Sequence, residues 1–72
     1  MPFVVYEIDL VTGNIEKPHP FSTEEEAREC AAEMVEGWRE GDDRVVINGN
    51  IHSVMTAAGP LDFGAIILRE VA

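Results

Sequence analysis

With 72 residues, of which 46% are hydrophobic, the chain is expected to form one small domain, 1–72, with a modest core. Its formal net charge of −9 disfavours direct binding to nucleic acid, because the phosphates would be repelled. No apolar run approaches the length of a membrane span, so no contact with a membrane is expected. The N-terminal MPFVVYEIDL lacks the basic region and cleavage site of a signal peptide, which favours a cytoplasmic location.

The first two predicted elements are strands that form a hairpin. Residues 3–10 alternate between a mixed face and an apolar face, and the apolar one consists of Val4, Tyr6, Ile8 and Leu10. Thr12-Gly13-Asn14 predicts a turn, because two of its residues tolerate a positive φ. The return strand, 15–21, contains Pro18 and Pro20, whose missing N–H groups fall on the same side of the strand. A strand that pairs on one side only is predicted to lie at the edge of a sheet.

Residues 21–43 contain the only helix that the sequence predicts. Ser22 is a suitable N-cap, and Glu25 completes an S-x-x-E capping box. Gly41, followed by Asp42 and Asp43, predicts the end of the helix. Six apolar residues between these signals recur at helical spacing and predict the face that packs on the core: Ala27, Cys30, Ala31, Met34, Val35 and Trp38.

Three further strands are predicted after the helix. Residues 44–47 form a short strand in which Val45, Val46 and Ile47 are β-branched. Asn48-Gly49 predicts a tight hairpin turn, and residues 51–58 return as far as Gly59-Pro60. The periodicity does not show whether the face of 51–58 that carries His52 and Val54 meets the core. Residues 63–71 form the last strand, and Ala65-Ile66-Ile67-Leu68 within it is apolar on both faces, as expected of a central strand. The fold class is therefore α+β, with the order ββαβββ and one amphipathic helix packed on a mostly antiparallel sheet.

A helix covers only one face of a five-stranded sheet, so an apolar face is expected to remain. We expect it to carry Phe3, Val5 and Val11 with one of two alternating pairs, Ile66 with Leu68 or Ala65 with Ile67. A single cysteine excludes an internal disulfide, and two histidines without clustered ligands argue against a metal. We therefore expect a homodimer through the open sheet face or a free edge. The alternative is a strongly twisted sheet that hides these residues within one chain.

The acidic residues are concentrated on the predicted helix. Residues 22–43 contain nine acids and two arginines, a local charge of −7. Five of the acids share an arc of about 80° on the helix face opposite the apolar one: Glu25, Glu29, Glu33, Glu36 and Glu40. They are interpreted either as a solvated face or as a row of charges, about 22 Å long, that meets a positively charged surface of another protein. Trp38, Asp42 and Asp43 complete the candidate partner-binding set, although Trp38 is also a suitable core residue.

In size and acidity the chain resembles small phage-encoded inhibitors, anti-CRISPR proteins among them. That resemblance implies a non-enzymatic protein that occupies a basic groove of nucleic-acid machinery, as a nucleic-acid mimic. The first alternative is a small enzyme, because Pro2 resembles the catalytic N-terminal proline of tautomerases of the 4-oxalocrotonate type. Against it, a hairpin rather than a helix follows the first strand, and Arg28 and Arg39 lie among glutamates. The second alternative is an accessory domain with a specific partner. No catalytic, metal or cofactor-binding residues are predicted.

Overall fold

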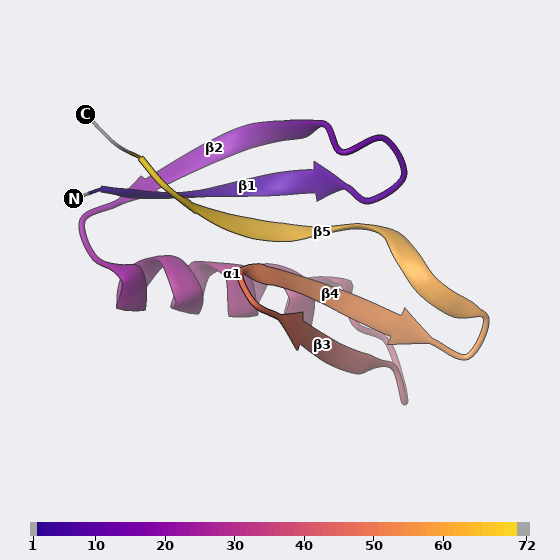
Figure 1. The fold of residues 1–72 in the computed structure, drawn as a ribbon. Coiled ribbons are helices and arrows are strands. Elements are labelled where there is room, and N and C mark those ends of the chain that lie inside the picture. The colour runs from indigo at the N-terminus through magenta and orange to yellow at the C-terminus, as the bar shows by residue number, and fades with distance from the viewer. Residues whose placement is uncertain (1, 71–72) are drawn as a thin grey trace.

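The longest strand, β5 (Gly59–Arg69), lies at the centre of a five-stranded antiparallel sheet. The computed structural model describes residues 2–70, and within them one helix, α1 (Glu24–Trp38), covers one face of the sheet (Figure 1). The strand order is β2-β1-β5-β4-β3. The other four strands are β1 (Phe3–Asp9), β2 (Ile15–Phe21), β3 (Arg44–Asn48) and β4 (Ile51–Thr56). The predicted α+β fold with the order ββαβββ is confirmed, and so is the central place of the last strand.

The β2 strand is an edge strand, as its prolines predict, and it is also irregular. The register between β1 and β2 shifts between Val5 and Glu7, where the backbone of Lys17 takes a φ of 55°. The Lys17 ammonium lies 3.1 Å from the Glu7 carboxylate across this bulge. Prolines, a bulge and a charged side chain together make this edge a poor template for a further strand.

The hairpin of β3 and β4 has a two-residue turn, Gly49-Asn50, with a φ of 62° at Gly49. Its tip is fastened to the central strand by Asn50, whose Nδ2 donates to the Ile67 carbonyl oxygen at 2.9 Å. The Ile67 amide in turn donates to the Asn50 carbonyl oxygen, also at 2.9 Å. These two bonds extend the pairing with β5 to Asn50, the residue before the start of β4.

The boundary between β4 and β5 differs from the sequence prediction. Thr56 ends β4, Ala57 and Ala58 form the turn, and Gly59 and Pro60 already belong to β5. Thr56 closes this turn by donating its hydroxyl to the Gly59 carbonyl oxygen at 2.7 Å. The predicted end of the last strand at Val71 lies outside the described residues.

The apolar stripe of α1 faces the sheet as predicted, but both predicted ends of the helix are wrong. Thr23, not Ser22, is the N-cap: its Oγ1 accepts from the Glu26 amide at 3.2 Å and donates to the Glu26 carboxylate at 3.0 Å. The chain contains two overlapping S/T-x-x-E patterns, and the second one is used because β2 continues to Phe21 and residues are needed to leave the sheet.

The helix also ends earlier than predicted, at Trp38, where the next residue, Arg39, is already extended with a ψ of 136°. The Asp43 amide donates to the Glu40 carbonyl oxygen at 3.0 Å, which closes a separate turn. Gly41 takes a φ of 55° in that turn and does not form the helix cap. Glu40, Asp42 and Asp43 therefore lie beyond the helix.

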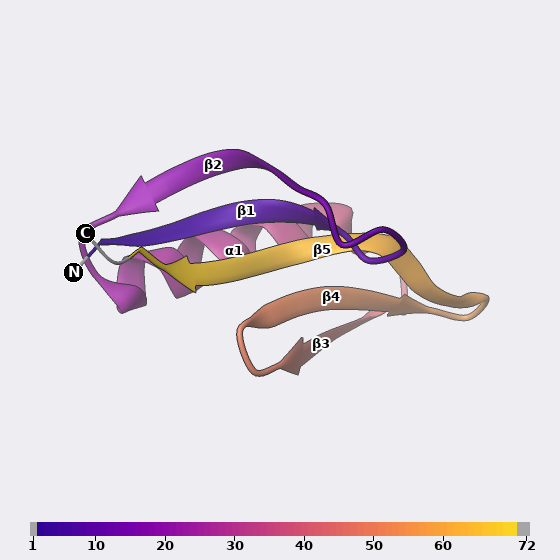
Figure 2. The same cartoon turned by 45° about the horizontal axis from the view of Figure 1, so that its top comes forward.

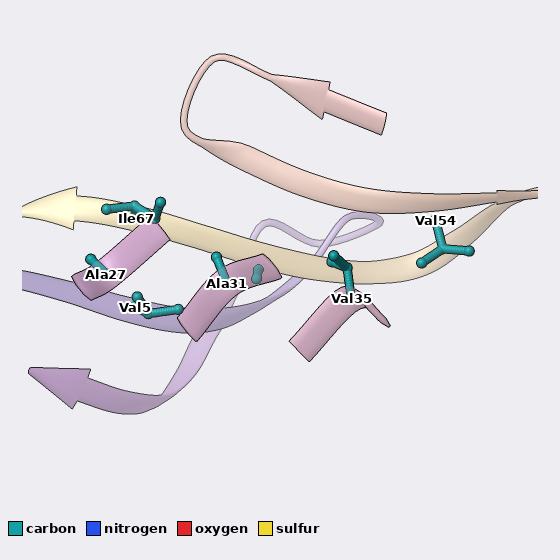
Figure 3. Close-up of a cluster of buried hydrophobic side chains, with 7 residues drawn as sticks. Val5, Ala27, Ala31, Val35, Val54 and Ile67 are labelled. Carbon is teal, nitrogen blue, oxygen red and sulfur yellow. The ribbon is translucent and has the colours of Figure 1, made fainter. Parts of the chain in front are cut away.

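The core lies between α1 and the middle of the sheet (Figure 3). The helix contributes small residues, which let it approach the strands closely, and the strands contribute mainly branched ones. Its buried members are Val5, Ala27, Ala31, Val35, Val54, Ala65 and Ile67. The helix lies over β1, β2, β4 and β5 and extends little over β3, the other edge strand.

The faces of β1 are the reverse of the expected arrangement. Val5 is completely buried under α1, so the alternating residues Val4, Tyr6 and Ile8 point to the opposite face of the sheet. Both faces of β1 carry apolar side chains, and the choice is made by helix packing rather than by the apolar content of one face. Val11 lies beyond the end of β1 and is exposed.

We call the sheet face that α1 does not cover the open face. On β5 it carries Ile66 and Leu68, because Ala65 and Ile67 are in the core. Cross-strand pairing aligns these residues in rows: Val4 with Leu68, Tyr6 with Ile66, and Ile66 with Ile51. On β4 the question left open by the sequence is also settled, since His52 and Val54 are buried on the helix side. In Figure 2, α1 lies behind β1 and β5, on one side of the sheet.

Candidate partner-binding surface

Three of the five glutamates that are predicted to share one face of the helix form a continuous exposed row on α1. Glu25, Glu29 and Glu33 follow one another at i, i+4 spacing, and all are exposed. None of them forms an ion pair with a residue of the described range 2–70. Like charges at this spacing repel one another by a few tenths of a kcal/mol for each pair. We call these three residues the acidic row.

Glu36 differs from the acidic row because its charge is already matched. Its Oε1 accepts from Arg39 Nε at 2.8 Å and from Nη2 at 2.7 Å. Arg39 also donates to the backbone carbonyl oxygens of Gly41 and Asp43, both at 3.3 Å. The arginine therefore holds the exit of the helix in place, and its bond with Glu36 raises its own pKa. Through Arg39, Glu36 is therefore part of the structure that follows the helix, and its carboxylate is not free for a partner.

Trp38 is the junction between the candidate surface and the core. Its side chain is half-buried and packs edge-on against Phe63, with ring centroids 4.8 Å apart and an interplanar angle of 85°. This pairing anchors the last turn of α1 on β5, where aromatic pairs of this geometry contribute about 1 kcal/mol. The structure thus gives Trp38 a packing role and leaves part of its ring exposed.

A groove that the sequence reasoning missed lies between the first half of α1 and the β3–β4 hairpin. Its volume is about 590 Å³, and its lining residues are Glu24, Glu25, Arg28, Glu29, Ala32, Ile47 and His52. The groove exists because α1 extends little over β3, which leaves Ile47 62% exposed. The sequence predicts the hairpin turn one residue earlier, at Asn48-Gly49, and only the turn at Gly49-Asn50 pairs Ile47 with His52 across the hairpin.

His52 is the one buried polar residue of the described core, with 3% of its surface exposed. Neither ring nitrogen has a hydrogen-bond partner among residues 2–70. Burial lowers the pKa of His52 from its ordinary value of 6.5, and the Arg28 guanidinium lowers it further. The imidazole is therefore neutral near pH 7, with one N–H donor and one acceptor nitrogen.

The remaining candidate groups are dispersed. Cys30 lies half-buried on the helix, and burial raises the pKa of its thiol, as does the Glu33 carboxylate. Pro2 borders a recess lined otherwise by Pro20, Phe21 and Ser22, where the tautomerase alternative requires arginines. Among residues 2–70 no three His, Cys, Asp or Glu side chains are grouped to hold a metal ion.

Comparison of the chain with protein-family models, with curated proteins and with solved structures gives no match. In the part of the chain that the structure describes, no helix is both long and apolar enough to cross a bilayer.

Proposed function

We propose that this chain is a non-enzymatic acidic binding protein that presents α1 to a basic surface of another protein. The supporting observation is the acidic row: three exposed glutamates, Glu25, Glu29 and Glu33, whose charges no described residue neutralises by an ion pair. A row of unpaired like charges costs some helix stability, and a cationic partner turns that cost into binding energy and faster association. The sharper form of the proposal is an inhibitor that occupies a nucleic-acid-binding groove in the cytoplasm.

We further propose that the protein is a homodimer through the open face. This face carries a part-buried apolar set, Tyr6, Ile51, Ile66 and Leu68, on the side opposite to α1. Two copies that pack through it keep their acidic helices on opposite outer faces, so the local charge of −7 in residues 22–43 is not brought together. Sedimentation over the micromolar range tests this, and a species of 7.9 kDa at every concentration would exclude the dimer.

The experiment for the binding function compares two variants with the same change of charge. In the first, Glu25, Glu29 and Glu33 become glutamine. In the control, three acids away from the helix are neutralised, Glu16→Gln, Asp62→Asn and Glu70→Gln. Partners captured from an extract of the source organism are identified and purified, and their affinities for the wild type and both variants are measured across a salt titration.

The acidic-row variant is expected to bind about tenfold more weakly, because each exposed ion pair contributes roughly 0.5 kcal/mol. The wild-type affinity should also fall with salt, since attraction between exposed charges is screened over about 8–10 Å near physiological ionic strength. The row variant should be as stable as the wild type or slightly more stable, since two like-charge pairs are removed. Equal affinity of both variants and the wild type at all salt concentrations would contradict the proposal.

A further inference from the structure

The groove beside the acidic row has the dimensions and lining of a binding site for one long side chain. Its volume of about 590 Å³ falls within the range of small-ligand pockets, roughly 300–1,000 Å³. One wall is α1, with Ala32 and two members of the acidic row, and the other is Ile47 of β3. Ile47 is 62% exposed and supplies apolar surface to this groove.

The charged side chains that line this groove are negative in sum. Arg28 is the one basic residue in the lining, and its Nε and Nη2 atoms donate to Glu24 Oε1 at 3.2 and 3.1 Å. This pair is largely neutralised. Glu25 and Glu29 lie on the same flank and form no ion pair within residues 2–70. An anionic or neutral ligand would leave both carboxylates uncompensated, whereas a cation would be attracted by both.

His52 is the second, independent observation that points to a ligand. It lines the groove, exposes only 3% of its surface, and has two ring nitrogens without a hydrogen-bond partner in the described residues. An unpaired buried polar group is unfavourable compared with an aliphatic one of similar size. Its cross-strand neighbour Ile47 is mostly exposed and lines the same groove. A ligand that reaches the ring can donate an N–H to its acceptor nitrogen.

We propose that this groove receives a lysine or arginine side chain of the basic partner, which enters with its cationic group first. The cation lies between the carboxylates of Glu25 and Glu29 and donates to His52, and the alkyl stem packs on Ala32 and Ile47. This inference rests on the proposed function, because it names the part of the partner that α1 and β3 hold. An arginine suits the site best, since its planar guanidinium donates to two carboxylates and an imidazole at once.

The test uses N-acetyl-arginine amide as the probe, with N-acetyl-citrulline amide as an uncharged isostere. Each is titrated into isotopically labelled protein, and the Ile47 methyl groups, the His52 ring nitrogens and the backbone amides of α1 are followed by NMR. Arginine is expected to give saturating shifts at Ile47 and His52, and citrulline is expected to give none. Saturation by both probes, or shifts spread evenly along α1 without the ring nitrogens, would overturn the proposal.

Two matched variants place the binding energy on the groove. Glu25→Gln with Glu29→Gln removes the two carboxylates from the lining, and the arginine affinity should fall roughly three- to tenfold, the effect of two exposed ion pairs. Glu16→Gln with Glu70→Gln makes the same charge change away from α1 and should leave the affinity within about twofold. An equal loss in both variants would mean general charge attraction rather than a site.

The outcome is separable from that of the proposed function. If the arginine probe fails to bind while a basic protein still binds through the acidic row, the groove assignment is wrong and the function stands. If the probe binds and no basic protein does, the site stands and the function is wrong.

Discussion

Replacement of His52 by leucine should change both the stability of the protein and its dependence on pH. Burial and Arg28 hold the pKa of His52 in the folded protein below its ordinary value of 6.5. Between the lowered pKa of the folded protein and the ordinary pKa of the unfolded chain, the unfolded chain therefore binds a proton that the folded protein does not. The free energy of unfolding must therefore rise with pH across this window and fall on acidification. For an imidazole that stays neutral in the fold, acidification from pH 7.5 to 5.5 costs at most about 1.4 kcal/mol.

The leucine variant lacks this proton and should show no such loss. At pH 7.5 it should also be more stable than the wild type, by about 1–3 kcal/mol, because an unpaired buried polar group is removed. The glutamates of α1 that line the same groove, Glu24, Glu25 and Glu29, are unchanged in the variant, so the difference between the two proteins isolates His52.

Urea unfolding at pH 5.5, 6.5 and 7.5 measures these free energies, with the fluorescence of Trp38 as the signal, since it is the only tryptophan and packs on Phe63. The protein concentration must be the same throughout, because a dimer would add its own contribution. If the wild type and His52→Leu lose the same free energy on acidification, His52 is charged or paired in the fold and the reasoning is wrong.

Three further predictions, on the helix cap, two glycines and Cys30, test the local structure, and the same unfolding measurement gives their free energies. Thr23→Ala should lower the free energy of unfolding by about 1 kcal/mol, because the helix loses its N-cap, whereas Ser22→Ala should change it by less than roughly 0.5 kcal/mol. The opposite order would mean that Ser22 is the N-cap, as the sequence predicts. Gly64→Ala should cost about 1–3 kcal/mol, since an added Cβ would lie 2.7 Å from a carbonyl oxygen of β4, but Gly37→Ala, with open space around it, should stabilise the helix by up to about 1 kcal/mol. Cys30 should react with a thiol reagent more slowly in the native state than in denaturant, because burial raises its pKa, and Cys30→Ala should cost about 1 kcal/mol; equal rates would place it on the exposed side of α1.

The sequence predicts best what local periodicity controls. The spacing of Ala27, Ala31 and Val35 defines the buried side of α1 whatever lies beneath it, so this face is predicted correctly. The prolines of β2 likewise predict an edge, because their missing N–H groups prevent a second strand from pairing on that side in any fold. The end of the helix is different: Gly41 is a plausible cap, but Trp38 packs on Phe63 and Arg39 leaves the helix before the glycine is reached.

What the sequence could not predict depends on contacts between distant segments. Val4 and Val5 are both valines and both buried, and only the position of α1 decides that Val5 is the one in the core between helix and sheet. The same holds for the groove, which requires α1 to stop short of β3 and His52 to face it. The glutamates of the acidic row are visible in the sequence, but the pairing of Glu36 with Arg39, which separates it from them, is not.

Because β1 and β5 pair at the centre of the sheet, the core closes only when residues as distant in sequence as Phe3 and Arg69 meet. The chain loses conformational entropy when it closes this long loop, before any apolar surface is buried in return. Folding should therefore be slower than in a protein whose contacts are local. On the ribosome, β1, β2 and α1 emerge before the strand that joins them, so Val5 and the apolar side of α1 remain uncovered until β5 is released. The domain is therefore expected to fold only once β5 has been synthesised, and the net negative charge of the chain keeps unfolded copies apart until then.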